Sequence, residues 1–164
     1  MLYDRMMSTP TKRLSEFIAT IDIDTVPSNV TAVVPQHCLE VIAGTYAGAD
    51  IPEAITVANL YSDDVADLAG KFAMVSHAAE SDPIHAGTTI CAGLIAVPPA
   101  LLMSPDGKTA VAAVLAGYET SIRIGEALGS ARLLGQGWWP TAVLGSAGAA
   151  ASAARAMSLD AKKT

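Results

Sequence analysis

"PTAVLGSAGAAASAARAM", residues 140–157, consists almost entirely of small side chains. Pro140 suits the first turn of a helix, because its ring fixes a helical φ and it has no N–H group to leave unbonded. The alanines and glycines that follow allow neighbouring helices to approach closely. The stretch therefore predicts a helix that begins at Pro140 and packs tightly against other helices.

The rest of the chain repeats its apolar residues at the same helical spacing. After Thr9 and Pro10, which are typical of a helix start, apolar residues recur at positions 14, 17, 18 and 21. Asp63 or Asp64 can cap a later helix, and Gly129 is a suitable helix end. No stretch alternates apolar and polar residues over a useful length, so the predicted class is all-α. The expected helices cover about 10–21, 27–44 with an interruption at Pro35, 52–62, 64–79, 89–103 with a kink at Pro98-Pro99, 110–128 and 140–157.

The composition limits the kinds of partner. Of the 164 residues, 51% are hydrophobic and only 5% aromatic, so the core must be built from small aliphatic side chains. Charged residues make up 16%, below the roughly 25% usual for soluble domains. We therefore expect part of the surface to be buried against a second copy or a partner subunit. The net charge of −6, without a long basic run, argues against nucleic-acid binding.

Neither a membrane span nor secretion is indicated. The most apolar stretch, Ile90 to Met103, is shorter than the roughly 20 residues needed to cross a bilayer. The N-terminus has no continuous apolar segment of the kind found in signal peptides. Cys38 and Cys91 have apolar neighbours and no paired spacing, which is typical of buried thiols. We expect a cytoplasmic protein.

The polar exception is "HAAESDPIHAG", residues 77–87, which gathers two histidines and two carboxylates. On a helix His77 and Glu80 would share a face and could bind one metal ion, but Pro83 separates them from His85 and no tight metal motif is present. A histidine with carboxylates beside apolar helices also suits proton transfer. The spacing alone favours a third interpretation, in which these residues cap helix ends and meet solvent.

Four blocks in fixed order carry a family resemblance. They are "LSEFIATI" (14–21) followed by "VIAGTYAGADIPEA" (41–54), residues 77–102 around the polar stretch, "AGYETSIRIGEALG" (116–129) and "GWWPTAVLGSAGAAASAARAMSLD" (137–160). The chain resembles the MmgE/PrpD family from Leu14 to Asp160. That family includes 2-methylcitrate dehydratase and cis-aconitate decarboxylase. The resemblance implies a helical domain that forms dimers, paired with a smaller α+β lid domain.

The resemblance also implies a reaction and its residues. Members act on small polycarboxylates by acid–base chemistry, without a metal or an organic cofactor. The family motif H-A-x-D-F-D-D-T-H aligns with residues 77–85, so Glu80, Asp82 and His85 are the expected catalytic residues. Ile84 replaces the motif's threonine, and Cys91 and Trp139 stand where the family has histidines; these three residues would line the substrate pocket.

The resemblance covers only the N-terminal part of the family's helical domain. We therefore expect a single helical domain over residues 1–164, with a core at about 9–160, frayed tails at 1–8 and 161–164, and no lid. Two functions follow as hypotheses: a lyase domain or fragment acting on a small polycarboxylate, or a non-catalytic helical module for dimerisation.

Overall fold

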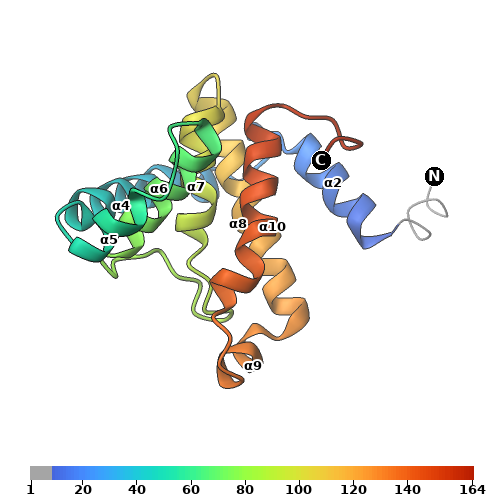
Figure 1. The fold of residues 1–164 in the computed structure, drawn as a ribbon. Helices are drawn as coiled ribbons and strands as arrows, with labels where there is room; N and C mark the ends of the chain where they lie inside the picture. Colours follow the sequence, from blue (N-terminus) through green and yellow to red (C-terminus); the bar gives the residue numbers. More distant parts are fainter. Residues whose placement is uncertain (1–8) are drawn as a thin grey trace, which may run out of the picture.

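A computed structural model describes residues 9–164 as an all-helical domain (Figure 1). Within these residues there is no β-strand, and a single isolated antiparallel bridge joins His85 and Ile90. The predicted all-α class is confirmed. The predicted N-terminal tail, residues 1–8, lies outside the described residues. The helices are α2 Pro10–Thr20, α3 Ser28–Thr31, α4 Val34–Gly48, α5 Pro52–Ala58, α6 Val65–His77, α7 Ala92–Met103, α8 Gly107–Leu128, α9 Ser130–Gly135 and α10 Pro140–Ala156.

Helices α7, α8 and α10 form the centre of the domain. Helix α7 is the most enclosed, because every residue from Ala92 to Ala100 is buried. Helices α4, α5 and α6 lie on one side of this centre and α2 on the other (Figure 1). No helix among the described residues is long and apolar enough to span a bilayer.

The small residues of α10 have the role that the sequence predicts. A Cβ atom at Gly148 would lie 2.9 Å from Ile95 of α7 and 2.9 Å from Ser121 of α8. The Ser152 hydroxyl donates a 2.7 Å hydrogen bond to the Ala96 carbonyl of α7. Contacts this close need residues without bulk at the crossing, so α10 packs tightly against both neighbours.

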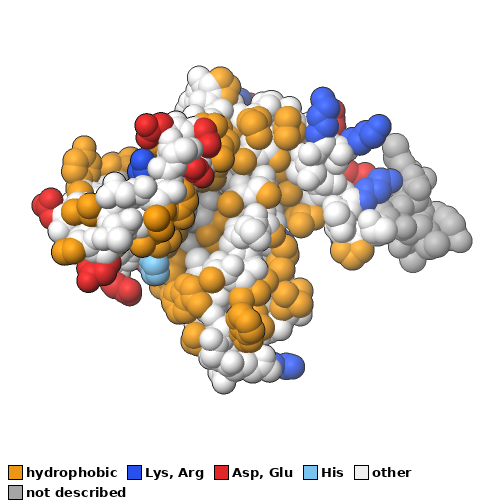
Figure 2. Space-filling view, viewed as in Figure 1, with side chains coloured by type: hydrophobic (Ala, Val, Ile, Leu, Met, Phe, Trp, Pro, Cys, Tyr) orange, Lys and Arg blue, Asp and Glu red, His pale blue; other side chains and the backbone are white. Residues whose placement is uncertain are grey.

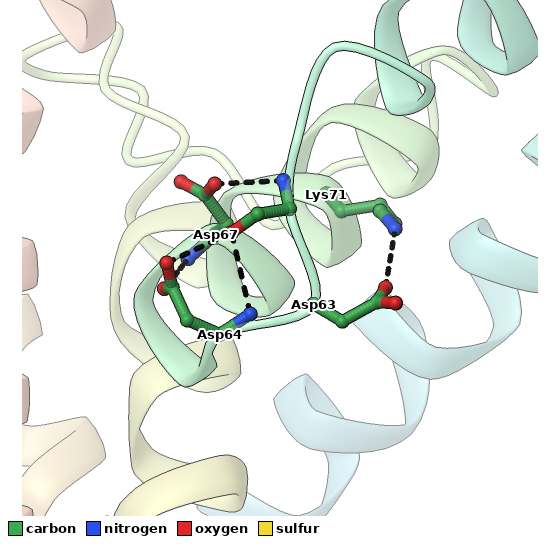
Figure 3. A network of polar contacts seen from close by, with 5 residues as sticks. Asp63, Asp64, Asp67 and Lys71 are labelled. Atoms are coloured by element: carbon green, nitrogen blue, oxygen red, sulfur yellow. Dashed lines mark hydrogen bonds and ion pairs between the residues drawn. The ribbon is translucent and has the colours of Figure 1, made fainter.

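Helix α6 begins at a network of polar side chains (Figure 3). The Asp64 carboxylate accepts hydrogen bonds from the backbone N–H groups of Ala66 and Asp67, both at 3.0 Å. These bonds satisfy donors that the first turn of a helix leaves free. They hold the pKa of Asp64 below its usual range, with the bond from Asp67 contributing most. Lys71, on the same helix, pairs with Asp63 at 3.4 Å.

The structure differs from the predicted elements at several places. Helix α8 begins at Gly107 rather than near Ala110, because the Asp106 side chain accepts the Thr109 N–H, and α4 continues past residue 44 to Gly48. Helix α7 begins at Ala92 rather than near Thr89, because Thr89 has a φ of 55° and the Ile90 carbonyl accepts the His85 N–H. Helix α5 ends at Ala58, short of the predicted end near Ser62. The short helix α9, Ser130–Gly135, was not predicted.

The apolar residues that recur at helical spacing along α6 are not fully buried. Val65 is exposed, Leu68, Phe72 and Val75 are partly buried, and Ser76 is the one buried residue of this helix. Its hydroxyl donates a 2.9 Å hydrogen bond to the Val41 carbonyl of α4. The side of α6 that faces α10 is uncovered, and this uncovered side forms one wall of a groove.

Candidate active site

An apolar groove of about 560 Å³ runs between α6 and α10, with α7 as its floor. Figure 2 shows hydrophobic side chains gathered around the hollow between these helices. Both walls are built mainly of alanine and glycine, and the floor carries larger apolar side chains such as Leu94 and Met103. His77 is the one ionisable side chain among the described residues that line the groove.

His77 is the last residue of α6 and lies at one end of the groove, with Trp139 and Thr141. Its Nδ1 atom is 2.6 Å from Oδ2 of Asp82. Its ring stacks on Trp139, with centroids 6.4 Å apart and planes 25° from parallel. A hydrogen bond on one side and a stacked ring on another fix the orientation of the imidazole.

Asp82 is the buried partner in this pair. Its side chain is 7% exposed, and its Oδ1 atom has no hydrogen-bond partner among the described residues. A carboxylate can only accept hydrogen bonds, so His77 donates through Nδ1–H. The Nε2 atom is then left for a ligand, the arrangement by which a carboxylate orients an imidazole for proton transfer.

Cys91 and Thr141 join the start of α7 to the start of α10. The Cys91 backbone N–H donates to the Thr141 hydroxyl at 3.0 Å. Burial is the main cause that raises the pKa of the Cys91 thiol to about 11; the Asp82 carboxylate acts in the same direction, and the Thr141 hydroxyl acts against it. The thiol therefore stays protonated at neutral pH and is unsuited to act as a nucleophile.

The remaining predicted site residues lie apart from the groove. Glu80 is exposed and has a φ of 51°, which lies in the left-handed region. Ile84 is 52% exposed. His85 Nδ1 is 2.9 Å from the Thr88 hydroxyl, and the Thr88 carbonyl accepts a bond from Ser130, so His85 holds its own loop together. The structure thus brings Asp82 and Trp139 to His77 and places Cys91 close to Asp82. The Glu80 carboxylate also raises the Cys91 pKa, whereas Ile84 and His85 lie apart from the groove.

The comparison with protein families addresses the same part of the chain. Residues 72–164 match the model of the MmgE/PrpD N-terminal domain. The chain belongs to this family. Comparisons with curated proteins and with solved structures gave no match. The match contains His77, Asp82, Cys91, Trp139 and Thr141, but membership does not by itself define a substrate or a reaction.

Two residues of this MmgE/PrpD domain, His77 and Thr141, lie at the groove end but were not among the predicted site residues. The sequence suggested His77 as a metal ligand beside Glu80, or as part of a polar stretch suited to proton transfer or to capping, and α6 ends before Glu80. The signal was a histidine at the end of a helix, followed five residues later by an aspartate. Within the described residues no group of three or more His, Cys, Asp and Glu side chains is placed to hold a metal ion.

Proposed function

We propose that this MmgE/PrpD domain takes part in a lyase reaction on a small polycarboxylate, with His77 moving the proton. The observation that carries the proposal is the 2.6 Å hydrogen bond between His77 and the buried Asp82 at one end of the groove. Family membership supports the choice of reaction class, because the sequence resembles dehydratases and decarboxylases of this family.

The proton steps need only the Nε2 atom of His77. In a dehydration, neutral Nε2 takes a proton from the carbon beside a carboxylate, and the electrons of that C–H bond form a C=C bond. The imidazolium returns the proton to the departing hydroxyl group, and water leaves. In a decarboxylation, the electrons left on carbon by departing carbon dioxide take a proton from Nε2–H. Asp82 stabilises the imidazolium in either direction.

In this proposal Asp82, predicted from the resemblance as a catalytic residue, positions His77 instead. Catalytic roles for Glu80 and His85 stay predictions of the family resemblance. Cys91 and Thr141 support the same end of the groove, because their hydrogen bond ties the first residues of α7 and α10 together. No metal or organic cofactor takes part in the proposed steps.

The test uses the whole purified chain with 2-methylcitrate and with cis-aconitate in deuterated water, followed by proton NMR. Loss of substrate, or exchange of a C–H proton for deuterium, reports proton transfer even when elimination is slow. We expect His77→Asn to abolish the signal and Asp82→Asn to reduce it about 10²-fold or more, the usual scale for general acid–base catalysis. His37→Asn is the matched control, because His37 pairs with Glu40 at 3.3 Å away from the groove. No turnover or exchange with either compound, or equal signals from all variants, would refute the proposal.

A second candidate is a non-catalytic module that forms homodimers. It is favoured by large apolar side chains that the described part of the chain leaves in solvent: Leu39 is 64%, Tyr46 81% and Leu60 80% exposed. Exposed apolar surface of this kind commonly marks an interface. Light scattering after size exclusion should then show a dimer that His77→Asn leaves intact, and a stable monomer would count against this candidate.

A further inference from the structure

We propose that the groove between α6 and α10 binds a carboxylate bearing one unbranched aliphatic chain, with the carboxylate at His77 and the chain between the two helices. This ligand class differs from the polycarboxylate of the proposed function, which would meet His77 at the groove end with its other carboxylates outside the groove. The inference rests on that function only in using the same His77 as the polar anchor. Binding of such a ligand requires no catalysis.

The side chains that line the groove favour an aliphatic ligand over a charged one. Apart from His77, its walls and floor contribute apolar side chains and the polar groups of Trp139, Thr141 and Ser146. No lysine, arginine or carboxylate is among the described residues that line it. A charge buried without a partner is costly, so a ligand lying along the groove can place one carboxylate at His77 but has no partner for a second further in.

The shape of the groove suits an extended chain. Its lining residues on α6 run from Ala66 to His77, a length of about 16 Å at a rise of about 1.5 Å per residue. Those on α10 run from Thr141 to Ala153. The volume of about 560 Å³ lies within the range of roughly 300–1,000 Å³ typical of small-molecule sites. The groove is therefore elongated, with its polar end at His77.

His77 is the group that can match the charge of the head group, and Asp82 orients it. The Asp82 carboxylate is buried and accepts from His77 Nδ1, and its second oxygen has no partner among the described residues. The imidazolium form of His77 presents Nε2–H as a donor at the groove end. A ligand carboxylate that accepts from Nε2–H completes a carboxylate–imidazolium–carboxylate arrangement, and the ring of Trp139 stacks beside it.

Fluorescence of Trp139 can report ligand binding. In a Trp138→Phe background it is the sole tryptophan of the chain, and its emission reports on a ligand beside His77. The titrants are decanoate, octanoate, decan-1-ol and propane-1,2,3-tricarboxylate, all below any micelle concentration. A buried methylene strengthens binding by about fourfold, so decanoate should bind up to about fifteenfold more tightly than octanoate. The tricarboxylate should bind more weakly than decanoate.

Two pairs of variants distinguish the contribution of the ligand carboxylate from that of its aliphatic chain. His77→Asn should weaken decanoate about tenfold, the scale of a charge-assisted hydrogen bond, and leave decan-1-ol unchanged. His37→Asn should change neither. Ala150→Leu, at an exposed position that lines the groove, should block both ligands, whereas Ala43→Leu on the exposed face of α4 should block neither.

The outcomes are distinct from those that test the proposed function. Decanoate binding that follows chain length and His77 supports the inference even if no polycarboxylate is turned over. Equal affinity for octanoate and decanoate, tighter binding of the tricarboxylate, or insensitivity to Ala150→Leu would overturn it, even if turnover is found. Absence of all binding would also overturn it. If the chain is then a dimer in which Trp139 is shielded from quenching by acrylamide, the groove is an interface between copies.

Discussion

Replacement of Gly117 by alanine tests the close packing of the three central helices. A Cβ atom at Gly117 of α8 would lie 2.6 Å from the Cβ of Ala96 on α7 and 3.0 Å from the Gly148 carbonyl oxygen on α10. Neither neighbour can move away by changing a rotamer, because one is the Cβ of an alanine and the other is backbone. The added methyl group must therefore push at least two helices apart.

The size of the effect follows from two opposing contributions. Overpacking of a dense core costs about 1–3 kcal/mol, whereas alanine is favoured over glycine inside a helix by about 1 kcal/mol. We expect Gly117→Ala to destabilise the domain by up to about 2 kcal/mol. For a chain of this size that lowers Tm by up to about 8 °C, measurable by thermal unfolding followed by circular dichroism.

Gly107→Ala is the matched control, because a Cβ atom at Gly107 in the first turn of α8 would meet nothing within 4 Å. It should leave Tm unchanged or raise it slightly, since only the helix preference of alanine is added. A Tm of Gly117→Ala equal to or above that of Gly107→Ala would refute the packing of α7, α8 and α10 described above.

Three further predictions concern single side chains. Asp64→Ala should lower Tm at pH 7, because it removes the cap of α6. The pKa of Asp64 is lowered in the folded state, so its contribution to stability is present above a pH of about 4 and is lost as the pH falls further. The Tm difference between Asp64→Ala and the original chain should therefore shrink in acid. Burial raises the pKa of the Cys91 thiol to about 11, so iodoacetamide at pH 8 should leave Cys91 unmodified in the folded chain and label it after denaturation, as peptide mass spectrometry would show; rapid labelling of Cys91 in the folded protein would contradict its burial. Ser152→Ala should reduce the free energy of unfolding in urea by about 0.5–1.5 kcal/mol, because the bond to Ala96 is lost, and an unchanged midpoint would contradict that bond.

Helix starts and ends were predictable from the sequence because local chemistry fixes them. Asp64 accepts the first free N–H groups of α6, and Pro140 begins α10, as predicted. Gly129 ends α8 with a φ of 61°, a left-handed conformation that glycine adopts without strain. Each of these features depends on the residue itself and on neighbours within one turn.

The buried face of α6 could not be predicted in the same way. Its apolar residues have helical spacing, but spacing does not say how many other helices surround them. Helix α6 packs on α4, α5 and α7, and its side toward α10 stays open as the groove. Ala69, Gly70 and Ala73 on that side line the groove. Small residues are equally typical of a close helix–helix contact, so the sequence alone could not distinguish the two.

The site itself depends on how the chain turns after α6. The φ of 51° at Glu80 reverses the backbone, and the Asp82 side chain then returns to His77. Pro83, which replaces an aspartate of the family motif, is buried against the start of α7, where a Cβ atom at Gly93 would lie 2.7 Å from its ring. An aspartate at position 83 would lose this ring contact and the fixed φ that proline has beside Asp82. We therefore expect Pro83→Asp to loosen the His77–Asp82 pair of the proposed site and to lower Tm, measured by thermal unfolding followed by circular dichroism; an unchanged Tm would contradict this role of Pro83.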